Sequence, residues 1–384
     1  KVTDSGRMQM FWQGNKIVDL SREFLDTNGC AKKQHAEVSH LQTIDNQVLN
    51  FNEDNLLKIL SSKNVASQKG LVEMFDASVG GTSVAMPFGG KHQLTEMEGS
   101  VQTLPILNAE NIETVSLASW GFDAEISSQN SLIGAANAVV ESVAKIVAMG
   151  GNYKNIRLSF QEYFEKLGNN PKKWGKPLAS LLGAYDAQMN FELAAIGGKD
   201  SMSGSFQDIH VPPTLISFAC ANGEKKNIIS PEFKKAGNKL YLFNHISQEN
   251  GMPNYGDLKQ IFDFIFENIK AKKIVSVKTI KEGGVAVALS KMSFGNHLGA
   301  EIELAEDLLL TKNIGSLIIE SSAVLENDLL QVIGEVSNSN ILKINTFEFN
   351  IEKLLEAWKG TFEELFPTAE EKKMVVEIDS KLNS

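Results

Sequence analysis

The chain has 384 residues, a formal net charge of −10, 42% hydrophobic residues and 22% charged residues. This length predicts two domains with pieces of a third, and the acidic balance argues against a general nucleic-acid binder, because neutralising phosphates needs clustered Lys and Arg. It still allows a local cationic pocket for a phosphorylated small-molecule substrate. No apolar run approaches the ~20 residues of a membrane span, and no signal peptide is recognisable.

The two cysteines, Cys30 and Cys220, are too few for a disulfide framework. This usage favours a cytoplasmic setting. Because Cys220 lies in an apolar run, we expect its thiol to be buried and inert.

Residues 1–63 are predicted to be the tail of a preceding domain and a connector. The opening KVTDSGRMQMFW is strand-like and starts with Lys1 rather than Met, so we expect the chain to be part of a longer protein. The segment Asn52–Leu60 is helix-like.

A first α/β domain is predicted over residues 64–222. Apolar residues recur at helical spacing over Leu132–Met149, where two glycines end the helix, and again over Pro177–Phe191. The strand-like runs ETVSLASW, NIRLS, AAI and PPTLISFACA lie between and around these helices.

A second α/β domain is predicted over residues 223–366, after a polar stretch that contains proline and glycine. Its strand-like runs are KLYLFN, IVSV, SLIIES and ILKIN, and its helices fall near Leu258–Ile269 and Leu354–Leu365. The highly charged residues 367–384 are predicted to be a linker.

The strongest local signal is AAIGGKDSMSGSF, where glycines let the backbone approach a ligand closely. In this turn Lys199 can meet a phosphate as a point charge, and Asp200 can hold Mg²⁺ or a ribose hydroxyl. The hydroxyls of Ser201 and Ser203 can donate to phosphate oxygens. A plain Gly/Ser turn between strands is an equally good explanation, and the spacing of a Walker loop is absent.

Two further charge patterns have simple alternatives. Glu141 and Lys145 lie four residues apart on one helix face, which an exposed ion pair would explain. In KTIKEGGVAVALSK, two glycines precede a helix and could receive an anion beside Lys278 and Lys281. A strand-to-helix turn with solvated lysines explains that segment equally well.

Taken together, five segments resemble phosphoribosylformylglycinamidine synthase of the large, single-chain type. They are LVEMFDASVGGTSVAMPFGGKHQ, AVVESVAKIVAMGG, LLGAYDAQM, AIGGKDSMSGSF with PPTLISFA, and EGGVAVALSKMSFGNHLG. The resemblance implies a mixed α/β fold with two consecutive domains like the N- and C-terminal domains of aminoimidazole ribonucleotide synthetase. It covers only the second half of the synthetase core.

The resemblance implies an ATP-dependent carbon–nitrogen ligase of purine biosynthesis, a glutamine amidotransferase that converts formylglycinamide ribonucleotide to its amidine. The cofactors implied are ATP and Mg²⁺, and both would depend on the missing first synthetase half. A glutaminase domain of the parent chain would be the other partner, and the fragment alone would be inactive. Ser159, Gly198, Lys199 and Asp200 would lie near the nucleotide, and Ser201 near the substrate phosphate.

Some family members hold an auxiliary Mg-nucleotide, and there the sequence departs from the pattern. Glu141 matches a metal ligand, but Lys145, Thr279 and Lys281 stand where an Asn, an Asp and a Ser are expected. We therefore hypothesise that Lys145 and Lys281 supply in fixed form the charge that Mg²⁺ would bring, so that the pocket is structural and metal-free or holds only an anion. Two other interpretations remain open: a stand-alone ATP-binding synthetase or kinase of the same superfamily, and a non-catalytic scaffold half.

Overall fold

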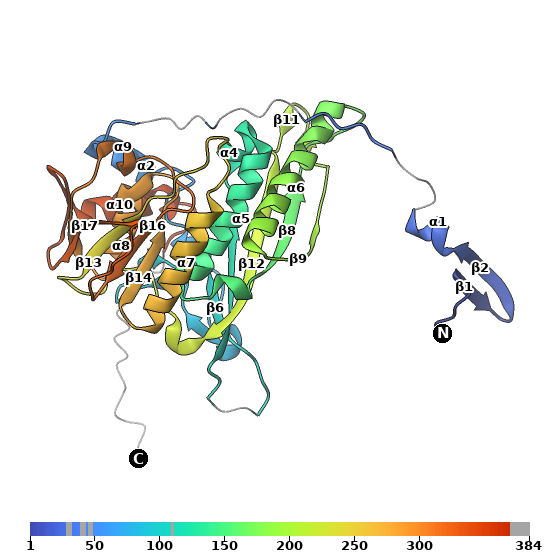
Figure 1. Ribbon diagram of the computed structural model, residues 1–384, viewed down its shortest axis with the longest axis horizontal. Helices are drawn as coiled ribbons and strands as arrows, with labels where there is room; N and C mark the ends of the chain where they lie inside the picture. Colours follow the sequence, from blue (N-terminus) through green and yellow to red (C-terminus); the bar gives the residue numbers. More distant parts are fainter. Residues whose placement is uncertain (28–32, 39–43, 45–48, 109–110, 369–384) are drawn as a thin grey trace, which may run out of the picture.

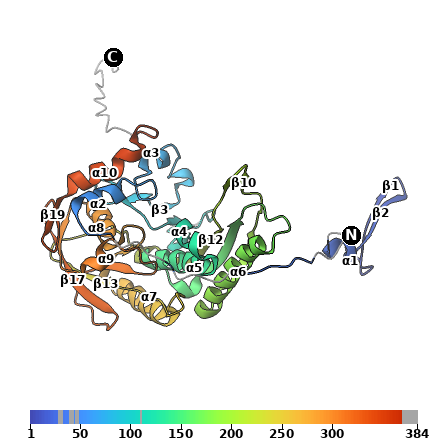
Figure 2. The same cartoon turned by 90° about the horizontal axis from the view of Figure 1, so that it is seen from above.

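A computed structural model describes residues 1–27, 33–38, 44, 49–108 and 111–368. Two large sheets with their helices make up the body of the molecule (Figure 1). An N-terminal hairpin of β1 (Arg7–Trp12) and β2 (Asn15–Ser21), followed by α1 (Arg22–Asp26), stands apart from that body in both views (Figure 2). The mixed α/β fold class is as the sequence predicts. Cys30 and the predicted linker beyond residue 368 lie outside the described residues.

The first sheet has six strands in the order β3-β6-β7-β12-β8-β9, antiparallel except for the parallel pair β8–β9. Helices α5 and α6 lie against one face of it (Figure 1). The elements of this layer are β3 (Ser83–Ala85), β6 (Ser100–Thr103), β7 (Thr114–Gly121), α4 (Ala124–Gln129), α5 (Ser131–Ala148), β8 (Arg157–Tyr163), α6 (Pro171–Phe191), β9 (Ala195–Lys199) and β12 (Thr214–Glu224).

Buried and exposed residues alternate in the central strands, which shows that only one face of this sheet is covered. In β12, Ser217 and Ala219 are buried under the helices, whereas Phe218 and Cys220 are exposed on the opposite face. Trp120 of β7 is half exposed on that same open face. The expectation of a buried Cys220 is therefore wrong, because an apolar run in a strand does not tell which of its alternate residues meets the core.

The second sheet has seven strands in the order β14-β16-β13-β17-β15-β18-β19, antiparallel except for the pair β15–β18. Its strands and helices are α2 (Glu53–Leu60), α3 (Lys69–Val72), β13 (Lys239–Phe243), α7 (Tyr255–Lys270), β14 (Ile274–Thr279), α8 (Gly284–Phe294), β15 (Gly299–Ile302), α9 (Glu306–Leu309), β16 (Leu317–Ser321), β17 (Leu330–Ser337), β18 (Ile341–Ile344), β19 (Phe347–Asn350) and α10 (Ile351–Glu363). Helix α2, far away in sequence, packs against α8 and α10.

Short hairpins complete the described structure. They are β4 (Phe88–Gly89) with β5 (Thr95–Glu96), and β10 (Ser205–Phe206) with β11 (Ile209–His210). The glycine-rich MPFGGKHQ segment is thus a hairpin turn.

Helix α5 is the long buried element that joins the two layers. Asn130 caps its start by accepting hydrogen bonds from the backbone amides of Leu132 and Ile133. The helix has 18 residues and is apolar enough to span a membrane, yet 83% of it is buried inside the fold. Such burial is typical of a core helix.

Two predicted boundaries differ from the structure. Helix α6 begins at Pro171 rather than near Pro177, because Asn170 caps it and a proline is well tolerated in a first helical turn. Strand β9 continues through Gly197 to Lys199, because it pairs with β8 along this stretch. The first three residues of the predicted turn GGKDSMSG are therefore strand.

Candidate functional site

The GKDS segment lies where the parallel strands β8 and β9 end together. The Ser201 amide donates to the Glu162 carbonyl (3.1 Å), and the Phe164 amide donates to the Ser201 carbonyl (2.9 Å). Gly198 must be a glycine for packing reasons, since a Cβ there would lie 2.5 Å from the Phe160 carbonyl oxygen of β8. These contacts hold the turn in one place at the end of the sheet.

A cavity of about 440 Å³ borders this turn. Gly198, Lys199 and Asp200 are exposed at its rim, so the corner is open rather than sealed among packed side chains. The cavity, here called the β9 cavity, is lined by Phe160, Glu162, Leu181, Ala184, Tyr185, Gln188, Ala195, Gly197, Gly198, Lys199 and Asp200.

The structure brings together only part of the predicted nucleotide set. Ser159 does not line the β9 cavity: it neighbours Leu158, which is buried under the helices, and alternation turns Ser159 to the open face of the sheet. Ser201 also lies outside the lining, and its hydroxyl is 2.9 Å from that of Ser203. Gly198, Lys199 and Asp200 therefore share the cavity, whereas Ser159 and Ser201 lie outside its lining.

Glu162 is a charged cavity residue that sequence reasoning did not single out. Its side chain points to the helix-covered face of β8 and is 8% exposed, and its Oε1 atom has no hydrogen-bond partner among the described residues. Burial, together with the nearby charge of Asp200, raises the pKa of Glu162 from 4.5 to about 7. The sequence does contain a sign of this position. Glu162 follows Phe160 by two residues, so the alternation of a strand puts both side chains on the same face.

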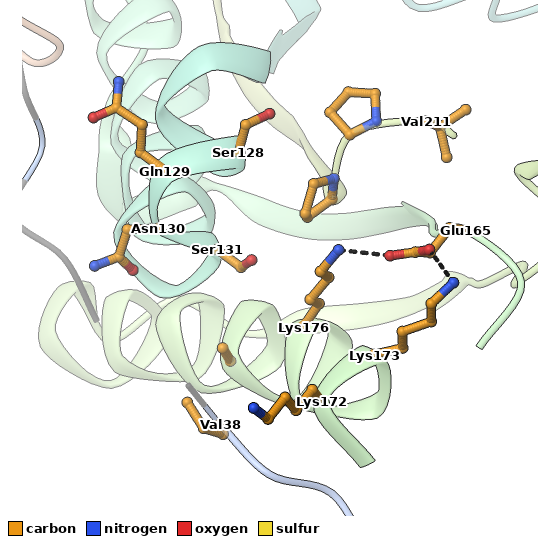
Figure 3. Close-up of a pocket in the computed structure, with 14 residues that line it drawn as sticks. Val38, Ser128, Gln129, Asn130, Ser131, Glu165, Lys172, Lys173, Lys176 and Val211 are labelled. Carbon is orange, nitrogen blue, oxygen red and sulfur yellow. Dashed lines mark hydrogen bonds and ion pairs between the residues drawn. The ribbon is translucent and has the colours of Figure 1, made fainter. Parts of the chain in front are cut away.

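A second cavity, of about 530 Å³, lies between the N-terminal ends of α5 and α6 (Figure 3). Glu165, buried at its wall, forms ion pairs of 2.5 Å with both Lys173 and Lys176 of α6. Although burial alone would raise the pKa of Glu165, these two ammonium groups lower it. The carboxylate thus holds two of the cationic side chains at this cavity.

Glu141 and Lys145 form a buried pair, not an exposed one. Their side chains are each 5% exposed and lie 2.7 Å apart on α5. The Lys145 ammonium also donates to the Trp120 carbonyl (2.7 Å) and lies 4.4 Å from the centre of the Trp120 ring, while Glu141 accepts from the Phe122 amide (3.1 Å). The surface-pair explanation fails because α5 is enclosed by the sheet on one side and by the second layer on the other.

Glu98 contacts the second predicted segment, which reaches this pair through Lys281. It accepts from Lys278 (2.8 Å) and from the Thr279 hydroxyl (2.6 Å). Lys281 lies 3.8 Å from Glu141, and Lys291 pairs with Glu96 at 2.7 Å. The result is a continuous cluster of charges between the two layers, here called the buried ion cluster: Glu96, Glu98, Glu141, Lys145, Lys278, Lys281 and Lys291. Lys281, whose side chain is 43% exposed, lies at its edge.

Burial and ion pairing shift the pKa values of these groups in opposite directions. Desolvation would raise the pKa of Glu98, but Lys278 and Lys281 outweigh it and hold that pKa at about 2. For Lys145, desolvation prevails over Glu141 and lowers the pKa. For Lys281, desolvation is outweighed by the surrounding carboxylates, with Glu141 the strongest, and the pKa is raised.

The buried ion cluster does not suit Mg²⁺. The Glu141 carboxylate is already in contact with two ammonium groups, and within the described part of the chain no three acidic, His or Cys side chains gather as a metal site. Hard divalent cations need several free oxygen ligands. Sequence reasoning found Glu141, Lys145, Thr279 and Lys281 but missed Glu98, which lies about 180 residues before its partner Lys278.

Comparison with known proteins shows similarity to subunits of one enzyme. No family model matches it. It is 24% identical over 417 aligned residues to phosphoribosylformylglycinamidine synthase subunit PurL of Methanocaldococcus jannaschii, covering 96% of this chain and 54% of that protein. The same subunit of Methanobrevibacter smithii is 23% identical over 408 residues, covering 94% and 53%. The chain thus spans about half the length of the curated relatives that it matches.

Solved structures show the same fold. The structure of PurLQS from Thermotoga maritima matches with a TM-score of 0.60 at 14% identity, covering 88% of this chain and 50% of that one. T. maritima PurL complexed with ATP matches with a TM-score of 0.54 at 14% identity, covering 87% and 49%. At this level of identity the likeness concerns the fold.

Proposed function

We propose that this chain is the second half of the synthetase core of a phosphoribosylformylglycinamidine synthase of the single-chain type. The whole enzyme would convert formylglycinamide ribonucleotide and glutamine to the amidine at the expense of ATP, in the cytoplasm. Support comes from the homologous PurL subunits, and from solved PurL structures complexed with ATP, ADP and FGAR. The chain's coverage of half of those proteins supports its role as a part of the catalytic unit.

The observation that carries this proposal is the open GKDS corner beside the β9 cavity. The reaction activates an amide oxygen with a phosphoryl group, and ammonia then displaces it, so catalysis depends on positioning and on neutralising phosphoryl oxygens. The exposed ammonium of Lys199 is suited to that neutralisation. The Ser201 hydroxyl can donate to the substrate phosphate, and Ser159 with Asp200 would contact the nucleotide.

The uncovered face of the first sheet supports a shared site. It presents Trp120 (50% exposed), Phe218 (40%) and Tyr163 (36%) to solvent. Apolar side chains gathered on one sheet face are typical of a surface that meets another protein layer. The first synthetase half is the proposed occupant, and a glutaminase domain would deliver ammonia.

The buried ion cluster is proposed to be a structural, metal-free counterpart of an auxiliary nucleotide site. Lys145 and Lys281 already neutralise Glu141, so Mg²⁺-nucleotide would have to displace a paired lysine. Calorimetry with ADP and Mg²⁺ on this chain checks this point. Tight, Mg²⁺-dependent binding of ADP that is lost in Glu141→Gln would count decisively against it.

The experiment that tests the function is an ATPase and ligase assay of the chain with and without a first synthetase half. Activity only in the combined sample is expected. Activity of the chain alone would favour a self-sufficient kinase or synthetase, and inactivity in both would favour a scaffold.

Two substitutions locate the chemistry within the combined enzyme. Lys199→Ala and Ser201→Ala are each expected to depress ligase turnover while glutaminase activity stays measurable, because they remove charge and a donor at the phosphoryl site. Lys235→Ala, which alters an exposed lysine in the second layer, is the matched control. Unchanged ligase kinetics in both test variants would remove this turn from the active site.

A further inference from the structure

The β9 cavity is lined by one buried acidic side chain, that of Glu162. Glu162 lines the cavity and is more than nine-tenths buried, and its Oε1 atom has no hydrogen-bond partner among the described residues. A buried carboxylate oxygen left without a donor is unfavourable, because it has lost its hydrogen bonds to water without replacement. A ligand that brings an N–H donor would remove this cost.

The remaining charges around the cavity favour a cation. Strand β8 contributes Glu162, strand β9 contributes Asp200 and Lys199, and helix α6 contributes Tyr185 as its titratable group. The Gln188 amide is already used, since it accepts from the Ala195 amide (2.9 Å) and donates to the Ala184 carbonyl (3.2 Å). With Glu162 ionised, two carboxylates face one ammonium group.

The walls restrict the shape of that cation. Phe160, Leu181 and Ala184 are apolar, and the Tyr185 ring lies at the rim. A bare ammonium ion would leave these walls unfilled, whereas a planar cation with an apolar body would cover them. An amidinium group places two N–H donors side by side, which is the spacing that a carboxylate accepts.

We propose that the β9 cavity binds an amidinium-class ligand, with Glu162 accepting its N–H donors and Asp200 adding negative charge at the rim. This deepens the proposed function and rests on it for its biological meaning, because the proposed reaction yields an amidine. Binding itself requires no turnover, so that it can be measured on the chain alone.

Isothermal titration calorimetry with benzamidine tests this proposal. Benzamidine stays cationic at pH 6 and pH 8, while Glu162 passes from mostly protonated to mostly ionised around its pKa of about 7. Affinity is therefore expected to rise about tenfold between these pH values. The neutral isostere benzamide should bind at least tenfold more weakly than benzamidine at pH 8.

Two variants separate a real site from adventitious binding. Glu162→Gln should lose the pH dependence and most of the affinity, whereas Glu326→Gln, at an exposed glutamate in the second layer, should behave as the parent chain does. Benzamidine affinity that is independent of pH and unchanged in Glu162→Gln would overturn the proposal. Ligase activity that still depends on Lys199 would then leave the proposed function standing.

Discussion

Replacing Glu162 with glutamine should make the protein more stable at neutral and alkaline pH. The folded protein holds the pKa of this carboxyl at about 7 against an ordinary value of 4.5. Below pH 4.5 the carboxyl is protonated in both states and its burial carries no charge penalty. As the pH rises through 7, the folded protein must either bury a charge or keep a proton that the unfolded chain has released.

The size of this effect follows from the two pKa values. Each pKa unit corresponds to about 1.4 kcal/mol, so ionised Glu162 destabilises the fold by about 3 kcal/mol above pH 7. Glutamine has the same shape without the charge. The stability gain of Glu162→Gln should therefore grow from near zero at pH 4.5 to about 3 kcal/mol at pH 8.

Urea denaturation at half-unit pH steps from 4.5 to 8 measures this gain as a difference in unfolding free energy. Glu326→Gln is the control and should change stability by less than about 0.5 kcal/mol at every pH, as exposed substitutions usually do. A gain in Glu162→Gln that stays constant with pH, or a loss that grows with pH, would refute the reasoning about this carboxyl.

Three further predictions concern the buried charges, the packing of helices and the exposed thiol of Cys220. Glu98→Gln should cost about 3–5 kcal/mol at pH 7 by leaving Lys278 unpaired, and the loss should shrink in urea titrations as the pH falls from 4.5 towards 2. Gly183→Ala should cost about 1–3 kcal/mol in thermal unfolding, since its Cβ would lie 2.0 Å from the Leu132 carbonyl oxygen, whereas Gly360→Ala, which has open space, should stabilise α10. Cys220 should react with a maleimide in the native chain, and addition of a first synthetase half should slow that labelling.

Several of these outcomes have clear opposites. If Glu98→Gln left the unfolding free energy unchanged, the buried ion cluster would not be needed for stability. Equal stability of the two glycine variants would contradict close packing of α5 on α6, and maleimide labelling unaffected by the first half would argue against its docking on the open sheet face.

The sequence by itself was sufficient for the main helices and for the position of the GKDS corner. Helical spacing of apolar residues predicts α5 and α7, and glycines with Lys199 and Asp200 mark the turn. The cap and proline at Asn170–Pro171 were also present in the sequence as a helix-start signal. Periodicity and turn chemistry are local, so a single sequence is enough to reveal them.

Only the tertiary structure decided which side chains lose water and which partners they find. A four-residue spacing cannot tell a surface pair from the buried pair Glu141–Lys145, and no local pattern joins Glu98 to Lys278. Alternation in β8 and β12 marks two faces, but the packing of α5 and α6 alone determines that Glu162 is covered and Cys220 is not. Burial and charge pairing depend on contacts between segments far apart in the chain, and these contacts fix the chemistry of the site.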